Sequence, residues 1–310
     1  MPTVANSPTA TPTAAPTARV VNPYGLILDA QGRLLVADGQ GKQVLRVDTS
    51  TGDVSLLAKG FTFPIDLALD RASDIYVADV DAYQVKKISA DGKVTPVLGS
   101  GKKGTGGAVG VPTAIDIGFV YALQFDAKGD LVFLEENTVR KLDLASGSIT
   151  TIARSLNEPH GMRLDRAGNI YVSDTTSHRV VRIDAATGAV TNIAGTTGQA
   201  GFAGDGGPAT AAKLNQPRHL AFDQSGNLYV ADQTNNRVRR IAMDGTISTV
   251  AGDGGASFLG DGGSALAAGV RSVWGVAVSA AGDLFVASPP SARVRRVDGK
   301  TSVISALTKP

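Results

Sequence analysis

Short apolar runs separated by polar turns cover the chain from about residue 22 to its end. Six segments share one pattern, in which an apolar run leads through an Asp-x-x-Gly-like turn into a second apolar run. They are GLILDAQGRLLVAD, DLALDRASDIYVAD, ALQFDAKGDLVFLE, GMRLDRAGNIYVSD, HLAFDQSGNLYVAD and GVAVSAAGDLFVAS. The turns begin at Asp29, Asp70, Asp126, Asp165, Asp223 and Ser279, with spacings of 39 to 58 residues. A pattern that recurs at such spacings predicts a repeat protein with one structural unit per repeat.

Each repeat continues through a polar loop into two further apolar runs. The third runs are QVLRVD, QVKKIS, TVRKLD, RVVRID, RVRRIA and RVRRVD, and each precedes a fourth such as VSLLAK or TISTVAG. Many second runs, such as IYVA, are apolar on successive residues, which is typical of strands covered on both faces. Six four-stranded antiparallel sheets predict an all-β fold, namely a six-bladed β-propeller over residues 19–310.

Longer, glycine-rich stretches separate some of the repeats. The sequences GFAGDGGPATAAKLNQP (201–217) and FLGDGGSALAAGV (258–270) share a Gly-Asp-Gly-Gly core, and a degraded copy begins at GSGKKG (99–104). Each joins a fourth strand to the next first strand, so we expect walls on the face where first strands begin, called the top face. PATAAKL predicts a helical turn, and we expect Asp205 and Asp261 to cap turns or that helix. GSGKKG fits G-x-G-x-x-G, but no helix follows it to receive a phosphate.

Acidic residues close most of the second strands, at Asp38, Asp79, Asp174 and Asp232. They could form a cation-binding ring, but acids that repeat with the scaffold favour a structural role in holding loops. An arginine follows two of them after five residues, so we expect the ion pairs Asp174 with Arg179 and Asp232 with Arg237. In the third repeat the following loop is two residues shorter, which leaves Glu135 and Glu136 beside a notch.

The residues that lead into the first strands should surround the central channel at the top face. Five residues before the turn acid lie Tyr24, Ile65, Tyr121, His160, Arg218 and Trp274, and Asp66 and His219 occupy the next position in their repeats. Arg163 and Gln124 are expected just below. Aromatic walls with a few convergent polar groups are typical of ligand sites, so Tyr24, Asp66, Tyr121, His160, Arg163, Arg218, His219 and Trp274 are the predicted ligand-binding residues. The alternative is that these side chains only plug the channel.

The amino-acid composition of the chain argues against several kinds of partner and binding site. The chain has a formal net charge of +2 with dispersed basic residues, which argues against a nucleic-acid partner. It has no cysteine, so disulfides and thiolate metal sites are excluded. No stretch approaches the roughly 20 apolar residues of a membrane-spanning helix. Residues 1–18, rich in Thr, Ala and Pro, predict a disordered linker to an upstream anchor or domain, and ARVV (18–21) could add an outer strand.

NLYVADQTNNRVRRI (227–241) and NIYVSDTTSHRVVRI (169–183) resemble NHL repeats, and the resemblance covers residues 22–310. The glycine-rich insertions are similar to those of bacterial extracytoplasmic NHL proteins and of teneurin-type propellers. Other relatives with this fold include extracellular sensor domains of bacterial Ser/Thr kinases and protein-interaction modules. The resemblance therefore implies a six-bladed propeller, and an extracellular or periplasmic location, without choosing a function.

The same family includes a peptide-amidating lyase that binds zinc through three channel histidines. Here only His160 and His219 lie on first strands, at unequal offsets from their turn acids, and His178 lies in a loop. Asp66, His160 and His219 could form a two-histidine, one-carboxylate site for a zinc or calcium ion, but without any spacing signature. The favoured hypothesis is a non-catalytic sensor or recognition module without a cofactor that binds a peptide, glycan or protein on the top face. A metal-dependent lyase or lactonase is the alternative, and a spacer is the third.

Overall fold

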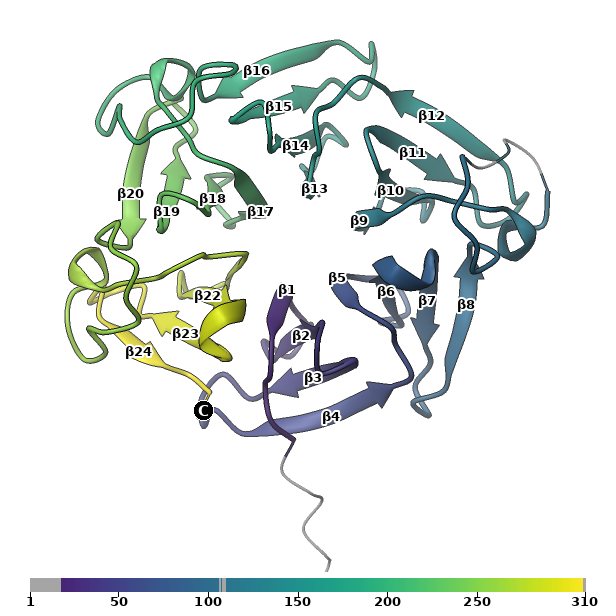
Figure 1. Cartoon of the computed structure of the whole chain (residues 1–310), viewed down its shortest axis with the longest axis horizontal. Coiled ribbons are helices and arrows are strands. Elements are labelled where there is room, and N and C mark those ends of the chain that lie inside the picture. The colour runs from purple at the N-terminus through teal and green to yellow at the C-terminus, as the bar shows by residue number, and fades with distance from the viewer. Residues whose placement is uncertain (1–17, 106, 108–109, 309–310) are drawn as a thin grey trace, which may run out of the picture.

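A computed structural model describes residues 18–105, 107 and 110–308 of the chain. Its 24 strands form six four-stranded antiparallel sheets arranged as the blades of a ring (Figure 1). In every blade the strands are paired in sequence order, and the first strand lies nearest the channel while the fourth lies at the rim. The predicted six-bladed propeller is confirmed. The predicted linker, residues 1–18, lies outside the described residues except for Ala18.

Each blade consists of one uninterrupted segment of the chain. Blade 1 holds β1 (Pro23–Leu28), β2 (Leu34–Asp38), β3 (Gln43–Val47) and β4 (Val54–Lys59), and blade 2 holds β5 (Pro64–Leu69), β6 (Ile75–Asp79), β7 (Gln84–Ile88) and β8 (Val94–Leu98). Blade 3 holds β9 (Val120–Phe125), β10 (Leu131–Glu135), β11 (Thr138–Leu142) and β12 (Ile149–Ala153), and blade 4 holds β13 (Gly161–Leu164), β14 (Ile170–Asp174), β15 (Arg179–Ile183) and β16 (Val190–Ala194). Blade 5 holds β17 (Pro217–Phe222), β18 (Leu228–Asp232), β19 (Arg237–Ile241) and β20 (Ile247–Ala251), and blade 6 holds β21 (Gly275–Val278), β22 (Leu284–Ser288), β23 (Arg293–Val297) and β24 (Ile304–Ala306).

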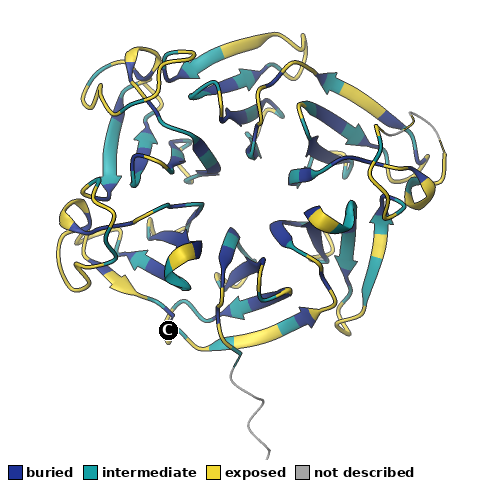
Figure 2. Cartoon of the chain, in the orientation of Figure 1, coloured by how far each residue is buried: buried dark blue, intermediate teal, exposed yellow. Residues whose placement is uncertain are grey.

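The apolar core lies between the blades, because each sheet packs both of its faces against neighbours (Figure 2). The second strands carry the continuous apolar runs, and every residue of β2 is buried. The turns between first and second strands are held by their acids: Asp29 Oδ1 accepts hydrogen bonds from the backbone N–H groups of Gln31 and Arg33. Gly32 follows with φ of 75°, a conformation that favours glycine.

The ring closes by packing blade 6 against blade 1, with no strand exchanged between them. Val20 is fully buried in the apolar cluster that the two blades share, and Asn22 Nδ2 donates to the carbonyl oxygen of Pro289 at 3.1 Å. The prediction that residues 18–21 add an outer strand is wrong, because they pair with no strand. Instead Asp38 at the end of β2 accepts the N–H of Val21 at 3.0 Å.

The glycine-rich insertions lie at the outer corners of the ring and do not wall the channel mouth (Figure 1). The second and third insertions pair with the rim strand of the following blade: Gly206 N–H donates to Ile247 of β20, and Gly262 N–H donates to Ile304 of β24. Short 3₁₀ turns are present at η2 (Pro112–Ala114), η3 (Ala209–Ala211) and η4 (Ala265–Ala267), so the predicted helical turn in PATAAKL is confirmed. Our expectation that the insertions surround the mouth is wrong.

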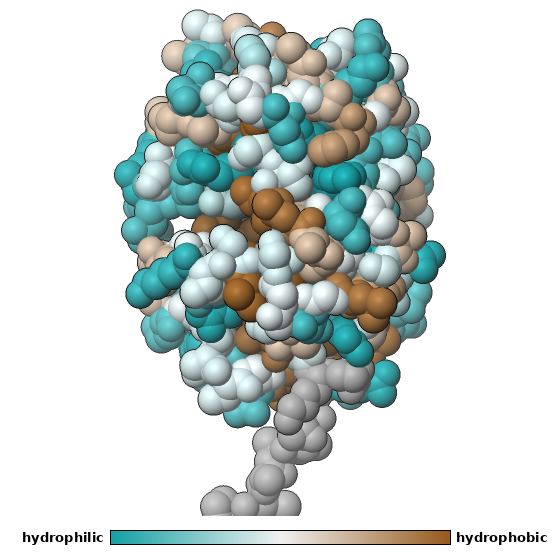
Figure 3. All heavy atoms as spheres, turned by 90° about the vertical axis from the view of Figure 1, so that its left-hand side faces the viewer, coloured by the Kyte–Doolittle hydropathy of each residue, from teal (hydrophilic) through white to brown (hydrophobic). Residues whose placement is uncertain are grey.

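Asp205 and Asp261 do not cap these turns, contrary to the prediction, since η3 and η4 have no side-chain cap. Each carboxylate instead binds a buried arginine of the following blade: Asp205 lies 2.7 Å from Arg239, and Asp261 lies 2.8 Å from Arg295. The side of the ring carrying these two insertions has small apolar groups set among hydrophilic ones (Figure 3). The insertions therefore tie neighbouring blades together at the rim.

Candidate functional site

Five of the six residues that lead into the first strands contact one another, namely Tyr24, Tyr121, His160, Arg218 and Trp274. Trp274 is the centre of this group, with its ring 4.8 Å from that of Tyr24 and 5.7 Å from that of His160, both in edge-to-face geometry. Tyr121 stacks on the other side of His160 at 4.4 Å. These four rings come from four different blades and are all half-buried, so they form an aromatic wall across the channel.

Arg218 projects from β17 into this wall. Its guanidinium lies 4.4 Å from the centre of the Trp274 ring, a cation–π distance, and its Nε donates to Gln233 Oε1 at 2.7 Å. One terminal nitrogen, NH1, is buried without a hydrogen-bond partner. Burial lowers the pKa of Arg218 to about 10, while Glu158 and the two tyrosines oppose that shift, so the group is a cation at neutral pH. A buried cationic donor without an acceptor can bind an acceptor atom of a ligand.

His160 is neutral in this position. Burial, followed by the positive charge of Arg218, lowers its pKa to about 3, and its Nδ1 donates to the carbonyl oxygen of Glu158 at 2.8 Å. The proton on Nδ1 leaves Nε2 as an acceptor. An imidazole that stays uncharged can stack against Tyr121 and Trp274 without the desolvation cost of a cation.

Asp66, Arg163 and His219 form a second, deeper layer. Arg163 lies between the other two, with NH2 2.5 Å from His219 Nε2 and NH1 3.6 Å from Asp66 Oδ2. Asp66 Oδ1 also lies 3.1 Å from His219 Nε2, and both of these side chains are almost fully buried. His219 Nε2 therefore lies within hydrogen-bond distance of both a carboxylate oxygen and a guanidinium nitrogen, and His219 Nδ1 lies 3.0 Å from the carbonyl oxygen of Val276.

The charges of this layer compensate one another. Burial alone would raise the pKa of Asp66, but Arg163, His219 and the N–H of Leu123 outweigh it and hold the pKa below its ordinary value. Burial and then Arg163 lower the pKa of His219. The layer is thus a carboxylate and a guanidinium that both contact a buried imidazole.

The three weak metal candidates do not come together as a set. Asp66 and His219 are neighbours in the deeper layer, whereas His160 lies in the aromatic wall and its Nδ1 binds a backbone carbonyl. Arg163 supplies the positive charge between Asp66 and His219, where a cation would have to bind. Within the described part of the chain, no three His, Cys, Asp or Glu side chains are grouped so as to hold a metal ion.

Sequence reasoning missed several residues of the mouth. Phe63 packs on Tyr24 at 5.3 Å, while Ile65, the residue expected at that position, is buried in the apolar core between blades 2 and 3. Gln233 orients Arg218, and it also lines a cavity of about 470 Å³ beside Tyr24 and Trp274, between blades 6 and 1. Gln124, expected below the mouth, joins blades 3 and 4 by accepting the N–H of Leu164. Phe63 and Gln233 lie outside the aligned column of positions, which is why the repeat pattern did not reveal them.

The acids at the ends of the second strands have structural roles, as favoured from the sequence. Each accepts backbone N–H groups from the segment that leads into its own blade: Asp79 from Thr62 and Phe63, and Asp174 from Asn157. The predicted pair of Asp174 with Arg179 is confirmed at 2.8 Å. The predicted pair of Asp232 with Arg237 is wrong. Asp232 instead lies 3.4 Å from Arg239, while Arg237 stacks over the ring of Phe202 at 3.8 Å.

Comparisons with known proteins place these observations in a family. Residues 167–259 match the family model of the teneurin NHL domain. The chain is 26% identical over 266 residues to Protein SUPPRESSOR OF QUENCHING 1, chloroplastic, of Arabidopsis thaliana, a match that covers 72% of this chain and 25% of that protein. It is 34% identical over 146 residues to teneurin-3 of Danio rerio, which covers 42% of this chain and 5% of that protein. The chain therefore spans a quarter or less of the length of these curated relatives.

Solved structures share the fold at low identity. A Bacteroides thetaiotaomicron protein of unknown function has a TM-score of 0.74 at 20% identity, covering 90% of this chain and 70% of that one. An auxiliary nutrient binding protein of the same species has 0.72 at 16% identity, covering 93% and 70%. Virginiamycin B lyase of Staphylococcus aureus has 0.59 at 14% identity, covering 94% and 86%.

Among the described residues no helix has the length and apolar content to cross a membrane. The recurring sequence segments and the ring of six four-stranded blades identify the chain as a six-bladed β-propeller, and its fourth and fifth blades match the teneurin NHL domain.

Proposed function

We propose that this propeller is a non-catalytic recognition module that binds a peptide, glycan or protein partner at the mouth of its channel. The observation that carries the proposal is the buried guanidinium of Arg218, whose NH1 has no partner and which lies against the aromatic wall. An unpaired buried donor destabilises the free protein, and a carbonyl, hydroxyl or carboxylate oxygen of a ligand would satisfy it.

The surroundings of Arg218 suit ligands that combine a flat or apolar face with an oxygen acceptor. The rings of Trp274, Tyr24, Tyr121 and His160 present such faces, and the cavity beside Trp274 gives room for a side chain or a sugar. Ligand sites of this kind orient their ligand through a few polar groups within a largely aromatic lining. Peptides and glycans both carry the required combination.

The deeper layer supports binding rather than chemistry. Asp66 and His219, the two groups that could act as a base or as metal ligands, are both engaged by Arg163 and lie beneath the aromatic wall. General-base catalysis needs a group within hydrogen-bond reach of substrate, at about 2.6–3.2 Å. The lyase among the structural neighbours shares the fold at 14% identity, which carries no chemistry over to this chain.

We also propose that the module works outside the cytoplasm, as part of a sensor or uptake system. Support comes from one structural neighbour that is described as a nutrient binding protein and from the sequence similarity to teneurins. The absence of cysteine is compatible with this location and does not require it.

A screen of glycan and peptide arrays with the wild-type protein and two double variants tests the proposal. Arg218→Ala with Trp274→Ala removes the cation and its aromatic partner from the mouth. Arg237→Ala with Phe202→Ala removes a similar pair at the rim, where the distance is 3.8 Å. We expect ligands that bind the wild type and the rim variant but lose at least tenfold in affinity for the mouth variant, with nearly unchanged thermal stability of both.

Three results would contradict the proposal. One is a set of ligands that the mouth variant binds as tightly as the wild type. Another is one equivalent of zinc or calcium in protein purified without chelator or histidine tag, lost in the His160→Ala, His219→Ala double variant, which would favour a metal-dependent lyase or lactonase. The third is a large loss of thermal stability in the mouth variant, which would show that Arg218 and Trp274 act as a structural plug.

A further inference from the structure

Two of the insertions carry an aspartate that binds the next blade at a defined position. In blade 5, Arg239 is fully buried at the middle of β19 and its NH2 lies 2.7 Å from Asp205 Oδ1. Thr249, which pairs with Arg239 across the two outer strands, donates its hydroxyl to Asp205 Oδ2 at 2.7 Å. In blade 6, Arg295 Nε donates to Asp261 Oδ1 at 2.8 Å. Each of these blades thus has a carboxylate site that the insertion fills.

Blade 3 has the same arginine and threonine. Arg140 lies at the corresponding position of β11 and pairs with Thr151 of β12, as Arg239 pairs with Thr249. Glu135, at the end of β10, takes the place of Asp232 and accepts from Arg140 NH1 at 2.5 Å. Arg140 NH2 donates to a carbonyl oxygen of the preceding insertion, that of Gly107, as Arg239 NH2 donates to that of Ala203.

The insertion before blade 3 has no acid at the position of Asp205 and Asp261, and its one acid, Asp116, follows η2 and accepts the hydroxyl of Ser100. Asp205 and Asp261 each come four residues before the first residue of a 3₁₀ turn, Ala209 and Ala265. The same count from Pro112, the first residue of η2, leads to Ala108. Ala108 lies outside the described residues, but a methyl side chain has no carboxylate.

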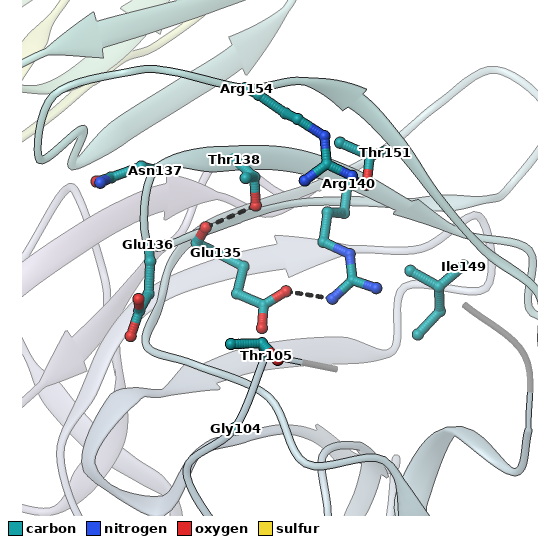
Figure 4. A pocket seen from close by; sticks show the side chains of 10 residues that line it. All are labelled: Gly104, Thr105, Glu135, Glu136, Asn137, Thr138, Arg140, Ile149, Thr151 and Arg154. Atoms are coloured by element: carbon teal, nitrogen blue, oxygen red, sulfur yellow. Dashed lines mark hydrogen bonds and ion pairs between the residues drawn. The ribbon is translucent and has the colours of Figure 1, made fainter. Parts of the chain in front are cut away.

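A cavity of about 480 Å³ lies beside Arg140 (Figure 4). Glu135 and Glu136 line it, so it lies where the shorter loop after the second strand was expected to leave a notch. Arg140 Nε is buried without a hydrogen-bond partner, as is Arg239 Nε in blade 5, while Arg295 Nε in blade 6 donates to Asp261. Thr151 and Arg154 line the cavity and are exposed, and Arg154 NH2 donates to Thr151 Oγ1 at 3.3 Å. The site is therefore open to a ligand from solvent.

The charges around the cavity favour an anion. Glu135 is neutralised by Arg140, and Glu136 lies 3.3 Å from Lys103. Arg154 makes no ion pair with any residue that the structure describes. One guanidinium is thus left over at the cavity, next to the hydroxyl of Thr151, which corresponds to the Thr249 hydroxyl that binds Asp205 in blade 5.

We propose that this cavity binds the carboxylate of an external ligand, in the place where blades 5 and 6 hold their own aspartates. The carboxylate would accept from Arg140 and Thr151, and Arg154 would contact it or a second acidic group. The cavity exceeds the volume of one carboxylate, and Ile149 adds an apolar surface, so a short aliphatic dicarboxylate or the glutamate side chain of a peptide fits its chemistry. This inference does not depend on the site at the channel mouth.

Isothermal titration with two probes tests the inference and separates the two sources of the carboxylate. The probes are glutarate and an acetylated, amidated tripeptide with one central glutamate. We expect saturable binding of at least one probe to the wild type, at one site per chain. Tighter binding of glutarate would identify a free dicarboxylate as the ligand, and tighter binding of the tripeptide would identify a peptide glutamate. Thr151→Val and Arg154→Ala should each weaken binding about tenfold, because each removes one donor from an exposed position.

Blade 5 offers a matched control. Thr249→Val should leave the titration unchanged, because Asp205 already fills that site. Asp205→Ala should open it, so that a second equivalent of the probe binds. The inference would be overturned by the absence of saturable binding of either probe, or by binding that Thr151→Val and Arg154→Ala both leave unchanged.

Discussion

His160 and His219 are buried as neutral imidazoles, and this couples the stability of the fold to pH. Burial is the main cause in both cases, and a neighbouring guanidinium adds to it, Arg218 for His160 and Arg163 for His219. The unfolded chain binds a proton at each histidine near pH 6.5, whereas the folded chain does not. The favourable contribution is therefore complete above about pH 6.5 and is lost as the pH falls toward the folded pKa.

Replacing His160 by glutamine should remove one of these protons. Between the unfolded pKa of 6.5 and the folded pKa of about 3, the free energy of unfolding of the wild type should fall more steeply with decreasing pH than that of His160→Gln. The difference in slope is about 1.4 kcal/mol per pH unit, the value for one proton. Urea titrations at a series of pH values measure it, and equal slopes for the two proteins would show that His160 is charged in the folded state.

The sequence predicted the membership of the channel mouth but not its layering. Tyr24, Tyr121, His160, Arg218 and Trp274 occupy one column of the aligned repeats, and periodicity alone places such a column at one height. The division into an aromatic wall and a charged layer depends on side-chain direction and on Arg163 reaching across to His219. Arg163 and His219 are 56 positions apart, so the sequence around either residue gives no indication of their contact.

At the scale of the element, the insertions and the third strands depend on each other. Blades preceded by an insertion carry an arginine at the middle of the third strand, at Arg140, Arg239 and Arg295, while blades 1 and 4 carry Leu45 and Val181 there. A buried arginine requires acceptors, and the insertion supplies them. Blade 2, which no insertion precedes, carries Lys86 at this position, and that lysine pairs with Asp79 of its own blade. An arginine at this strand position, next to an insertion that carries an acid, was visible in the sequence and could have predicted the roles of Asp205 and Asp261.

Removing the aspartate of the second insertion should destabilise blade 5. Asp205→Ala leaves the fully buried Arg239 with one acceptor fewer, which we expect to cost about 1–3 kcal/mol. Asp253→Ala is the matched control, because that exposed carboxylate only accepts the N–H of Gly255 within its own turn. Chemical denaturation measures both. Equal stabilities of the two variants would mean that Asp205 does not hold the insertion to its blade.

At the scale of the whole molecule, the ring is closed without strand exchange, so close contact between the inner strands must hold at every junction. Glycines permit the closest approaches: a Cβ at Gly275 would overlap the carbonyl oxygen of Tyr24, and one at Gly161 would overlap that of Arg218. These glycines lie one position after Trp274 and His160, so the same junctions that close the ring also fix the aromatic wall.

Substituting the glycine at the junction of blades 6 and 1 should weaken closure. Gly275→Ala forces β21 away from β1, with an expected loss of about 1–3 kcal/mol from overpacking. Gly263→Ala is a suitable comparison, since its added Cβ would lie an ordinary 3.4 Å from the nearest atom. Thermal unfolding of both variants measures the difference. If Gly275→Ala is as stable as Gly263→Ala, β21 and β1 can move apart to accommodate the methyl group without loss of stability.

The single tryptophan of the chain gives the most direct test of ligand binding at the mouth. Trp274 lies within the proposed site, so its fluorescence reports events there and nowhere else. Ligands found by the array screen should shift the emission of Trp274 saturably and protect it from acrylamide quenching, and Arg218→Ala should abolish both effects. Ligands that bind without changing the emission or the quenching of Trp274 would contradict the account and place recognition elsewhere on the propeller.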